Sequence, residues 1–359
     1  MQLIVHLPLI KIVLPANAGF LFDQLMKIAA FDPFDTTPYW EALLSLDPTV
    51  PVDQNFEALG YESLYFLQNL GSLAIFFAAY FVALVFLLLC KCLCCCECCR
   101  WIIDRLSRNL LFGPLINLIS GSYTAVIVSC MIHVQHMCWN SYGEITQSLA
   151  TIFFLVLFLA FPLVESLYLV YRFDDLGEEE MQVRHGAFTS DLDLRRGRRV
   201  LLQPVWFYLR RIIIGVAVVF LNENAVWQFL LLIFTVLVQM IVLGILEPFE
   251  SRSRVRQEIL DESVVMVVLY HFMCFSDFVP DVTARLLLGY SLITFVVVWL
   301  LGRLGWNMWT NLKNLKFRLI VCRAHCWHWI TKRCRRKLKD ERKLTRRTLL
   351  FQKRKQILE

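Results

Sequence analysis

Residues 65–90 read YFLQNLGSLAIFFAAYFVALVFLLLC, a run that is apolar at almost every position after Ser72. A helix needs roughly 20 mostly apolar residues to cross about 30 Å of hydrocarbon. This run is long enough and carries no charged side chain, so it predicts a membrane-spanning helix. The solvent that decides the fold is therefore a lipid bilayer, in which every backbone polar group must be paired within the protein.

Six further apolar stretches follow it along the chain. The 359 residues are 58% hydrophobic and 18% charged, whereas soluble domains are about 45–50% apolar and about 25% charged. The sequence predicts an all-α membrane protein, a bundle of about seven transmembrane helices. The predicted spans are 65–90, 110–133, 145–170, 200–221, 226–246, 263–278 and 284–304.

Three regions follow from this pattern: an N-terminal segment (1–60), a seven-helix transmembrane domain (61–305) and a basic tail (306–359). The first region is acidic and rich in proline, which predicts short amphipathic helices joined by turns. Its small-residue triplet at 16–18 resembles a signal-peptide cleavage site. No basic stretch precedes it and prolines interrupt the apolar run, so an exoplasmic or interfacial segment is the favoured interpretation.

Basic residues predict the orientation of the bundle. Lys and Arg gather in the segments after the first, third and fifth spans, and residues 303–359 hold 18 Lys/Arg against 3 Asp/Glu, or +15 in a chain whose net charge is +6. Cytoplasmic segments carry an excess of Lys and Arg. We therefore predict that the N-terminus lies outside and the C-terminus in the cytosol.

A cluster of cysteines ends the first span. Juxtamembrane cytosolic cysteines are acceptors for reversible S-palmitoylation, and thiols in a reducing compartment do not form stable disulfides. A metal cluster is an alternative, although the spacing lacks two separated Cys-x-x-Cys pairs. A third interpretation is simple packing of small residues at a helix end. The acylation candidates are Cys90, Cys92, Cys94, Cys95, Cys96, Cys98 and Cys99.

Ionisable residues within predicted spans form a second candidate site, because such groups are costly in a bilayer and often mark function. The two arginines either pair with Glu165 or reach the interface, where Trp206 and Tyr208 would form an aromatic belt. Arginine does not recur at every third position, which argues against a voltage sensor. Asp277 is expected at the outer interface. The candidates are Glu165, Arg210, Arg211, His271 and Asp277.

The tail segment 312–339 alternates bases with large apolar side chains. Such a basic amphipathic helix is typical of a surface that binds anionic inner-leaflet lipids, and a calmodulin-like protein is the alternative partner. No recognition motif accompanies the charge, so nucleic acid is not an expected partner. We find no phosphate-binding loop, nucleophile elbow or zinc-protease motif, and therefore expect neither an enzyme nor a cofactor.

A set of short motifs carries a family resemblance. The motifs are EILDES (258–263), YHF (270–272), FSDFVPD (275–281), HLPL (6–9), LPANA (14–18), GYES (60–63), NLGS (69–72) and EPF (247–249). With these motifs the chain resembles the C-terminal multi-span regions of large ciliate membrane proteins, which are distantly similar to transient receptor potential-like and polycystin-like channels. The resemblance covers most of the chain up to about residue 321 and implies an integral protein of a eukaryotic cell membrane or internal membrane.

The resemblance implies cation conduction, but one part of those channels is missing. They conduct through a pore helix and filter between their last two spans, and here residues 278–283 leave no room for a re-entrant helix. Any path must therefore run between spans, along polar residues such as Asn117, Gln239, His271 and Asp277. The alternative function is a seven-span receptor or a membrane scaffold with a lipid- or calmodulin-binding tail.

Overall fold

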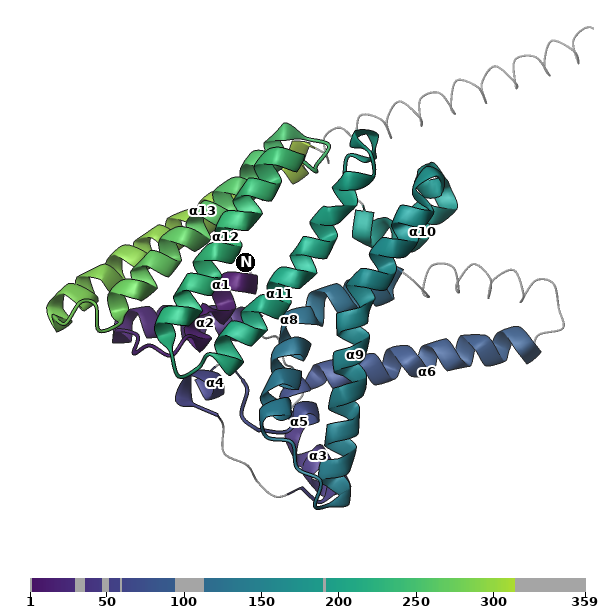
Figure 1. Cartoon of the computed structure of the whole chain (residues 1–359), viewed down its shortest axis with the longest axis horizontal. Coiled ribbons are helices and arrows are strands. Elements are labelled where there is room, and N and C mark those ends of the chain that lie inside the picture. The colour runs from purple at the N-terminus through teal and green to yellow at the C-terminus, as the bar shows by residue number, and fades with distance from the viewer. Residues whose placement is uncertain are drawn as a thin grey trace, which may run out of the picture. The chain divides into compact units, whose positions relative to one another are not determined.

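The computed structural model describes residues 2–29, 36–46, 52–58, 60–93, 113–189 and 192–313. The chain divides into two compact units, 1–293 and 294–359. Within the described ranges the structure is helical, and the only strand-like pairing is an isolated bridge between Leu192 and Phe249. The expected all-α fold is therefore confirmed for these residues (Figure 1).

The first unit contains the labelled helices of Figure 1 and the beginning of an apolar helix, Val282–Lys313, that continues into the second unit. The labelled elements are α1 (Gln2–His6), η1 (Leu7–Leu9), α2 (Ala16–Ala29), α3 (Thr37–Leu44), α4 (Gln54–Ala58), α5 (Phe66–Leu70), α6 (Ser72–Leu93), α8 (Gly113–Gln135), α9 (Tyr142–Tyr171), η2 (Phe173–Gly177), α10 (Glu179–Thr189), η3 (Leu194–Arg196), η4 (Arg198–Leu201), α11 (Leu202–Phe220), α12 (Ala225–Leu246) and α13 (Arg252–Phe275).

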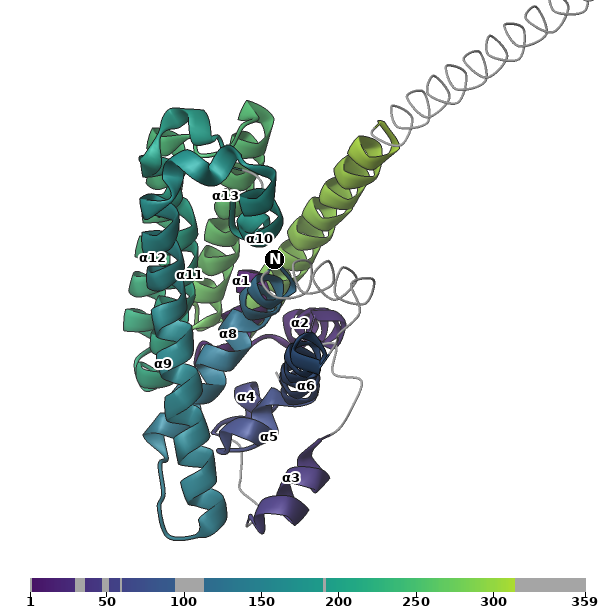
Figure 2. The same cartoon turned by 90° about the vertical axis from the view of Figure 1, so that its right-hand side faces the viewer.

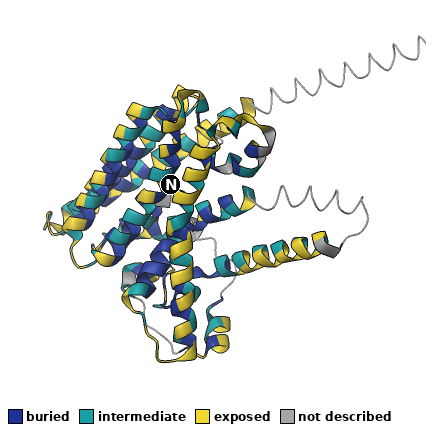
Figure 3. Cartoon of the chain, turned by 45° about the vertical axis from the view of Figure 1, so that its right-hand side comes forward, coloured by how far each residue is buried: buried dark blue, intermediate teal, exposed yellow. Residues whose placement is uncertain are grey.

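Helix α8 is the most buried of the long helices. It packs against α9 and α11, while α12 packs against both α11 and α13, and α11, α12 and α13 lie near one another in two views at right angles (Figures 1 and 2). Figure 3 shows the opposite extreme in α6, whose surface is largely exposed. An apolar helix with exposed apolar side chains suits a lipid environment.

Helix α9 shows how local chemistry sets this packing. It begins with a capping box, in which the Ser141 hydroxyl accepts from the Glu144 N–H and the Glu144 carboxylate accepts from the Ser141 N–H. Pro162 lies inside the helix and has no N–H to donate to the Phe158 carbonyl one turn earlier. The Tyr123 hydroxyl of α8 donates to that carbonyl over 2.8 Å, so the proline creates an acceptor for a contact between helices.

Among the residues that the structure describes, six helices are long and apolar enough to cross a membrane, which indicates a multi-pass integral membrane protein. They are Ser72–Lys91, Gly113–Gln135, Tyr142–Tyr171, Arg198–Phe220, Ala225–Leu246 and Val282–Lys313. The first differs from the predicted span in its start. Gly71, at φ 51°, separates the short α5 from α6, a backbone conformation that glycine adopts without strain.

The remaining predicted span, 263–278, corresponds to α13, which does not reach the same apolarity. Its 24 residues would extend about 36 Å, but only the part after Glu262 is apolar. The first half carries six charged residues: Arg252, Arg254, Arg256, Glu258, Asp261 and Glu262. Helix α13 can therefore cross a bilayer only if part of this charged half enters it, and the count of seven stays a prediction.

A glycan-acceptor scan tests whether α13 crosses. We expect an acceptor sequence inserted at 276–281 or 136–141 to be glycosylated and one inserted at 247–250 to stay unmodified, because only lumenal or extracellular sites meet the transferase. The readout is a glycosidase-sensitive mass shift. Modification at both 247–250 and 276–281 would contradict a spanning α13.

Residues 172–197, between the third and fourth predicted spans, contain the helix α10 and two short 3-10 turns, η2 and η3. We call residues 172–197 together with residues 247–256 the basic end of the bundle. We call the connecting segments 136–141, 221–224 and 276–281 the turn end. Polar contacts of Arg196 and Asp193 with Glu247 and Pro248, which we call the clamp, link the two parts of the basic end. The Arg196 guanidinium contacts Glu247 at 2.8 Å and Asp193 at 3.2 Å, and the Asp193 N–H donates to the Pro248 carbonyl.

The clamp predicts a pH dependence of stability. The hydrogen bond from Arg196 lowers the pKa of Glu247 below its ordinary value of 4.5. Because the pKa is lower in the folded protein, the contact stabilises the fold above the ordinary pKa, and this stabilisation is lost as the pH falls through the lowered value. Thermal unfolding midpoints of wild type and Glu247→Gln should differ at neutral pH and converge in acid. Glu250→Gln, an exposed neighbour, should show no such convergence.

The second unit is described over 294–313, where the apolar helix ends. Trp306 and Trp309 lie in its last turns, and Lys313 Nζ is 4.9 Å from the centre of the Trp309 ring. Tryptophan and lysine at the end of a span are typical of the membrane interface. The predicted tail from residue 314 onward lies outside the described residues.

Candidate functional site

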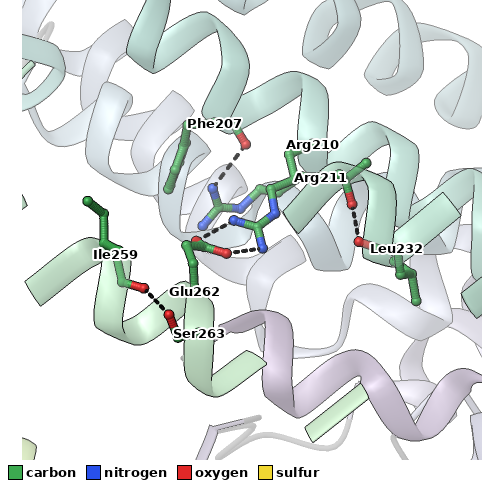
Figure 4. Close-up of polar contacts among 8 residues, drawn as sticks. Phe207, Arg210, Arg211, Leu232, Ile259, Glu262 and Ser263 are labelled. Atoms are coloured by element: carbon green, nitrogen blue, oxygen red, sulfur yellow. Dashed lines mark hydrogen bonds and ion pairs between the residues drawn. The ribbon is translucent and has the colours of Figure 1, made fainter. Parts of the chain in front are cut away.

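A buried ion pair joins α11 to α13. Arg210 Nη1 and Nη2 donate to Glu262 Oε1 and Oε2 over 2.5 and 2.6 Å, so that the guanidinium and carboxylate meet through two parallel bonds (Figure 4). The side chains are 9% and 11% exposed. A bidentate pair is among the strongest polar contacts in proteins, and it compensates two charges that would each be costly alone.

This finding corrects the expected partner of Arg210. We predicted either a pair with Glu165 or an arginine reaching the interface, and the structure gives Arg210 neither arrangement. Arg210 lies ten residues, about 15 Å, from the end of α11 at Phe220. It is therefore held near the middle of the helix by the first half of α13.

Arg211 points to a different neighbour, because successive residues of a helix are rotated by about 100°. Its Nε donates to the Thr124 hydroxyl of α8 over 3.1 Å. Its guanidinium carbon lies 3.4 Å from the centre of the Phe207 ring (Figure 4), a cation–π contact. The two arginines thus bind two different helices, α13 and α8.

Tyr208 was expected in an interfacial belt and is instead 3% exposed inside the bundle. Its hydroxyl forms a hydrogen bond with the Ser120 hydroxyl of α8. Its ring centre lies 4.7 Å from that of Tyr123 and 5.8 Å from that of Phe188 on α10. The belt interpretation is wrong for this residue because α8 and α10 cover it.

Glu165 pairs with His185, a residue that sequence reasoning missed. Glu165 Oε1 and His185 Nδ1 are 2.6 Å apart, and the side chains are 13% and 6% exposed. His185 lies on α10, whose buried residues Met181, His185 and Phe188 recur at spacings of four and three. This spacing is typical of the buried face of a helix and could have indicated that His185 is buried. The many charged residues of the segment obscured the pattern.

Several polar atoms near the ion pair have no hydrogen-bond partner within the described part of the chain. Arg210 uses both terminal nitrogens on Glu262, but its Nε remains unpaired. On the same side of α11, at spacings of three and four, lie Gln203 and Trp206. The unpaired atoms are Gln203 Oε1, Trp206 Nε1, Arg210 Nε and, on α12, Gln239 Oε1. We call these atoms and the Arg210–Glu262 pair the polar cluster.

The other predicted polar residues lie away from this cluster. His271 Nδ1 contacts the Val267 carbonyl at 2.8 Å and Nε2 the Ser291 hydroxyl at 3.3 Å. Asp277 is fully exposed at the turn end, with Arg285 Nη2 at 3.8 Å, and its place at the outer interface stays a prediction. Asn117 is exposed.

The acylation candidates are described only at their start. Cys90 is half-buried near the end of α6 and forms no disulfide, and the backbone at Cys92 belongs to the same helix. Cys94, Cys95, Cys96, Cys98 and Cys99 lie outside the described residues, as does most of the segment 312–339. Among the residues that the structure describes, no cluster of His, Cys, Asp and Glu is arranged to hold a metal ion.

The site is therefore a set of buried charges and polar atoms that hold neighbouring helices together within the bundle. Comparison with known proteins gives no match: no family model, no curated protein and no solved structure is similar to this chain.

Proposed function

We propose that this integral membrane protein is channel-like and transports cations along a path between α11, α12 and α13, without a pore loop. The observation that carries the proposal is the polar cluster: four buried polar atoms on α11 and α12 have no hydrogen-bond partner among the described residues, and one of them belongs to the arginine of the buried Arg210–Glu262 pair. Such atoms are costly in hydrocarbon and are tolerated where water or a solute reaches them.

The distances of these residues along their helices, measured from the turn end, support one continuous path. Counted from the turn end, Arg210 lies about 15 Å along α11, Glu262 about 20 Å along α13 and Gln239 about 21 Å along α12. Gln203 and Trp206 extend the cluster from there towards the basic end. The Arg210–Glu262 pair lies within this path, where its opening or closing would control passage.

Flux from reconstituted liposomes tests this proposal. We expect the purified full chain to conduct K⁺, Na⁺ or Ca²⁺, and Gln239→Leu to reduce the flux at least about tenfold by removing a polar group from the path. Glu165→Gln is the control, because Glu165 binds His185 outside α11–α13. If the wild-type protein gave no ion flux with any of the tested ions, voltages and lipid compositions, the proposal would be overturned.

The alternative function is a receptor or membrane scaffold. It is favoured by α6, whose apolar surface is mostly left uncovered by the described residues. A helix of this kind suits contact with another membrane protein as well as with lipid. Co-purification of a stoichiometric partner that requires α6, together with absence of flux, would favour this alternative.

We further propose that the basic end faces the cytosol and anionic inner-leaflet lipids. Exposed arginines there include Arg172, Arg195, Arg198 and Arg199, each of which would be attracted to a negatively charged surface. A calmodulin-like partner at 312–339 and acylation of the cysteine cluster belong to the same proposal. Hydroxylamine-sensitive mass shifts test the acylation.

A further inference from the structure

Residues 4–22 of the N-terminal segment bury many of their apolar side chains within the described part of the first unit. Helices α1 and α2 pack against each other, and α1 contacts α13. Figures 1 and 2 both place α1 and the N-terminus beside the middle of the bundle. We call residues 4–22 the N-terminal hairpin. Its buried side chains are Ile4, Val5, Leu7, Leu9, Ile10, Ile12, Ala18 and Phe22.

This burial exceeds what an exoplasmic or interfacial segment requires. Leu9 and Ile10 are 0% exposed, so protein surrounds them on all sides. Pro8 and Pro15 interrupt the apolar run in the sequence, which hid the segment from a search for long apolar helices. The chain accommodates the prolines by breaking into α1, η1 and α2.

Gln228 fixes the hairpin to the bundle. Its Oε1 accepts from the Lys11 N–H over 3.2 Å, and its Nε2 donates to the Ala217 carbonyl of α11 over 3.1 Å. Gln228 is 0% exposed, and one side chain on α12 thereby holds both the hairpin and α11. Asn55 of α4 adds a bond from its Nδ2 to the Ile10 carbonyl.

Two contacts hold α2 in the same place. Asn17 Nδ2 donates to the Leu286 carbonyl over 2.9 Å. The Phe22 ring meets the Phe272 ring of α13 edge-on, with centres 5.2 Å apart. These contacts lie at the turn end, since Leu286 and Phe272 are close to the turn 276–281.

The face of α12 that holds the hairpin also carries part of the polar cluster. Gln228, Leu232, Thr235 and Gln239 are all buried and recur at spacings of four, three and four, which places them on one side of the helix. Gln228 and Gln239 are about 16 Å apart along this side. The hairpin therefore covers the turn end of the same helix face whose other end carries Gln239.

We infer that the N-terminal hairpin is an internal plug, which closes the turn end of the path between α11, α12 and α13 and must move aside for ions to pass. The inference rests on the proposed function. Two features support a removable element. Its apolar run is divided into separate helical pieces, α1, η1 and α2, and among the described residues its attachment to α4, α12 and the helix that begins at Val282 includes single side-chain hydrogen bonds from Asn55, Gln228 and Asn17.

A reversible cross-link tests the plug. A Cβ at Gly289 would lie 2.8 Å from Asn17 Cγ, a separation that a disulfide between cysteines at the two positions can bridge. In the double variant Asn17→Cys/Gly289→Cys we expect the disulfide to form and flux to be at least about tenfold lower than after reduction, because the plugged state is then locked. Each single variant should respond to reductant no more than wild type.

A variant that weakens the attachment of the hairpin to α12 should raise the flux. Gln228→Leu removes the acceptor of the Lys11 N–H, and we expect its flux to exceed that of wild type several-fold. Gln135→Leu is its control, because it makes the same substitution on α8, outside the proposed path, and removes a bond to the Val219 carbonyl of α11 without touching the hairpin. Flux that is equal in the oxidised and reduced double variant would overturn the plug while leaving the proposed function intact. Failure of the disulfide to form would contradict the placement of the hairpin. Absence of flux in every variant, Gln228→Leu included, would overturn both.

Discussion

Replacing Glu262 by leucine is expected to lower the free energy of unfolding by about 3–5 kcal/mol, because the substitution leaves the Arg210 charge buried without its partner. The two side chains are about nine-tenths buried and share two short hydrogen bonds. Chemical unfolding in detergent micelles, followed by circular dichroism, measures the change. Arg210→Met should cost a similar amount, since it strands the carboxylate instead.

A double variant separates loss of the pair from loss of one charge. We expect Arg210→Met/Glu262→Leu to be more stable than either single variant, because no buried charge is then left uncompensated. Glu258→Gln is the matched control: Glu258 is one turn earlier on α13 and pairs with Arg254 at 3.3 Å in a more exposed setting, where ion pairs contribute little. A Glu262→Leu protein as stable as Glu258→Gln would contradict the buried pair.

Replacing Gly215 by leucine is the second change with a large expected effect. A Cβ on Gly215 would lie 2.9 Å from Met131 Sδ and 3.0 Å from Ile127 Cγ2 of α8, so a Cβ alone requires these side chains to shift, and a whole leucine side chain overpacks the contact between α8 and α11. Overpacking of this kind costs about 1–3 kcal/mol, and small residues are what allow spanning helices to approach closely. The same unfolding measurement applies.

Gly244 provides the comparison within the same bundle. It lies in α12, and a Cβ there would meet nothing within 4 Å, so Gly244→Leu should be neutral or slightly stabilising through better helix propensity. If both glycine variants unfolded at the same denaturant concentration, the close contact between α8 and α11 would be contradicted.

The spanning helices were predictable because the bilayer imposes a rule on composition. Runs such as residues 72–90 are apolar on every side, and length and apolarity are properties that a single sequence contains. Six of the seven predicted spans correspond to helices with the required apolarity. Helix α13 falls short because Glu262 is compatible with the membrane only through its partner on α11, which composition does not reveal.

The partners inside the bundle were harder to predict. Arg210 and Glu262 are 52 residues apart, and which acid meets which base depends on the order in which the helices pack. The expected pair of Arg210 with Glu165 assumed that the only acid within a neighbouring span must be the partner. Helix α10 supplies His185 to Glu165 instead, and α13, whose charged half looked like a loop, supplies Glu262.

Gly71 separates α6 from the packed helix α5, and the described residues leave most of the α6 surface exposed. With 22 residues, α6 is about 33 Å long, slightly more than an average hydrocarbon layer, and beyond Phe77 few side chains restrain it. Hydrophobic mismatch is relieved by tilting. In thinner bilayers we therefore expect α6 to lean about its glycine joint while the packed helices keep their angles.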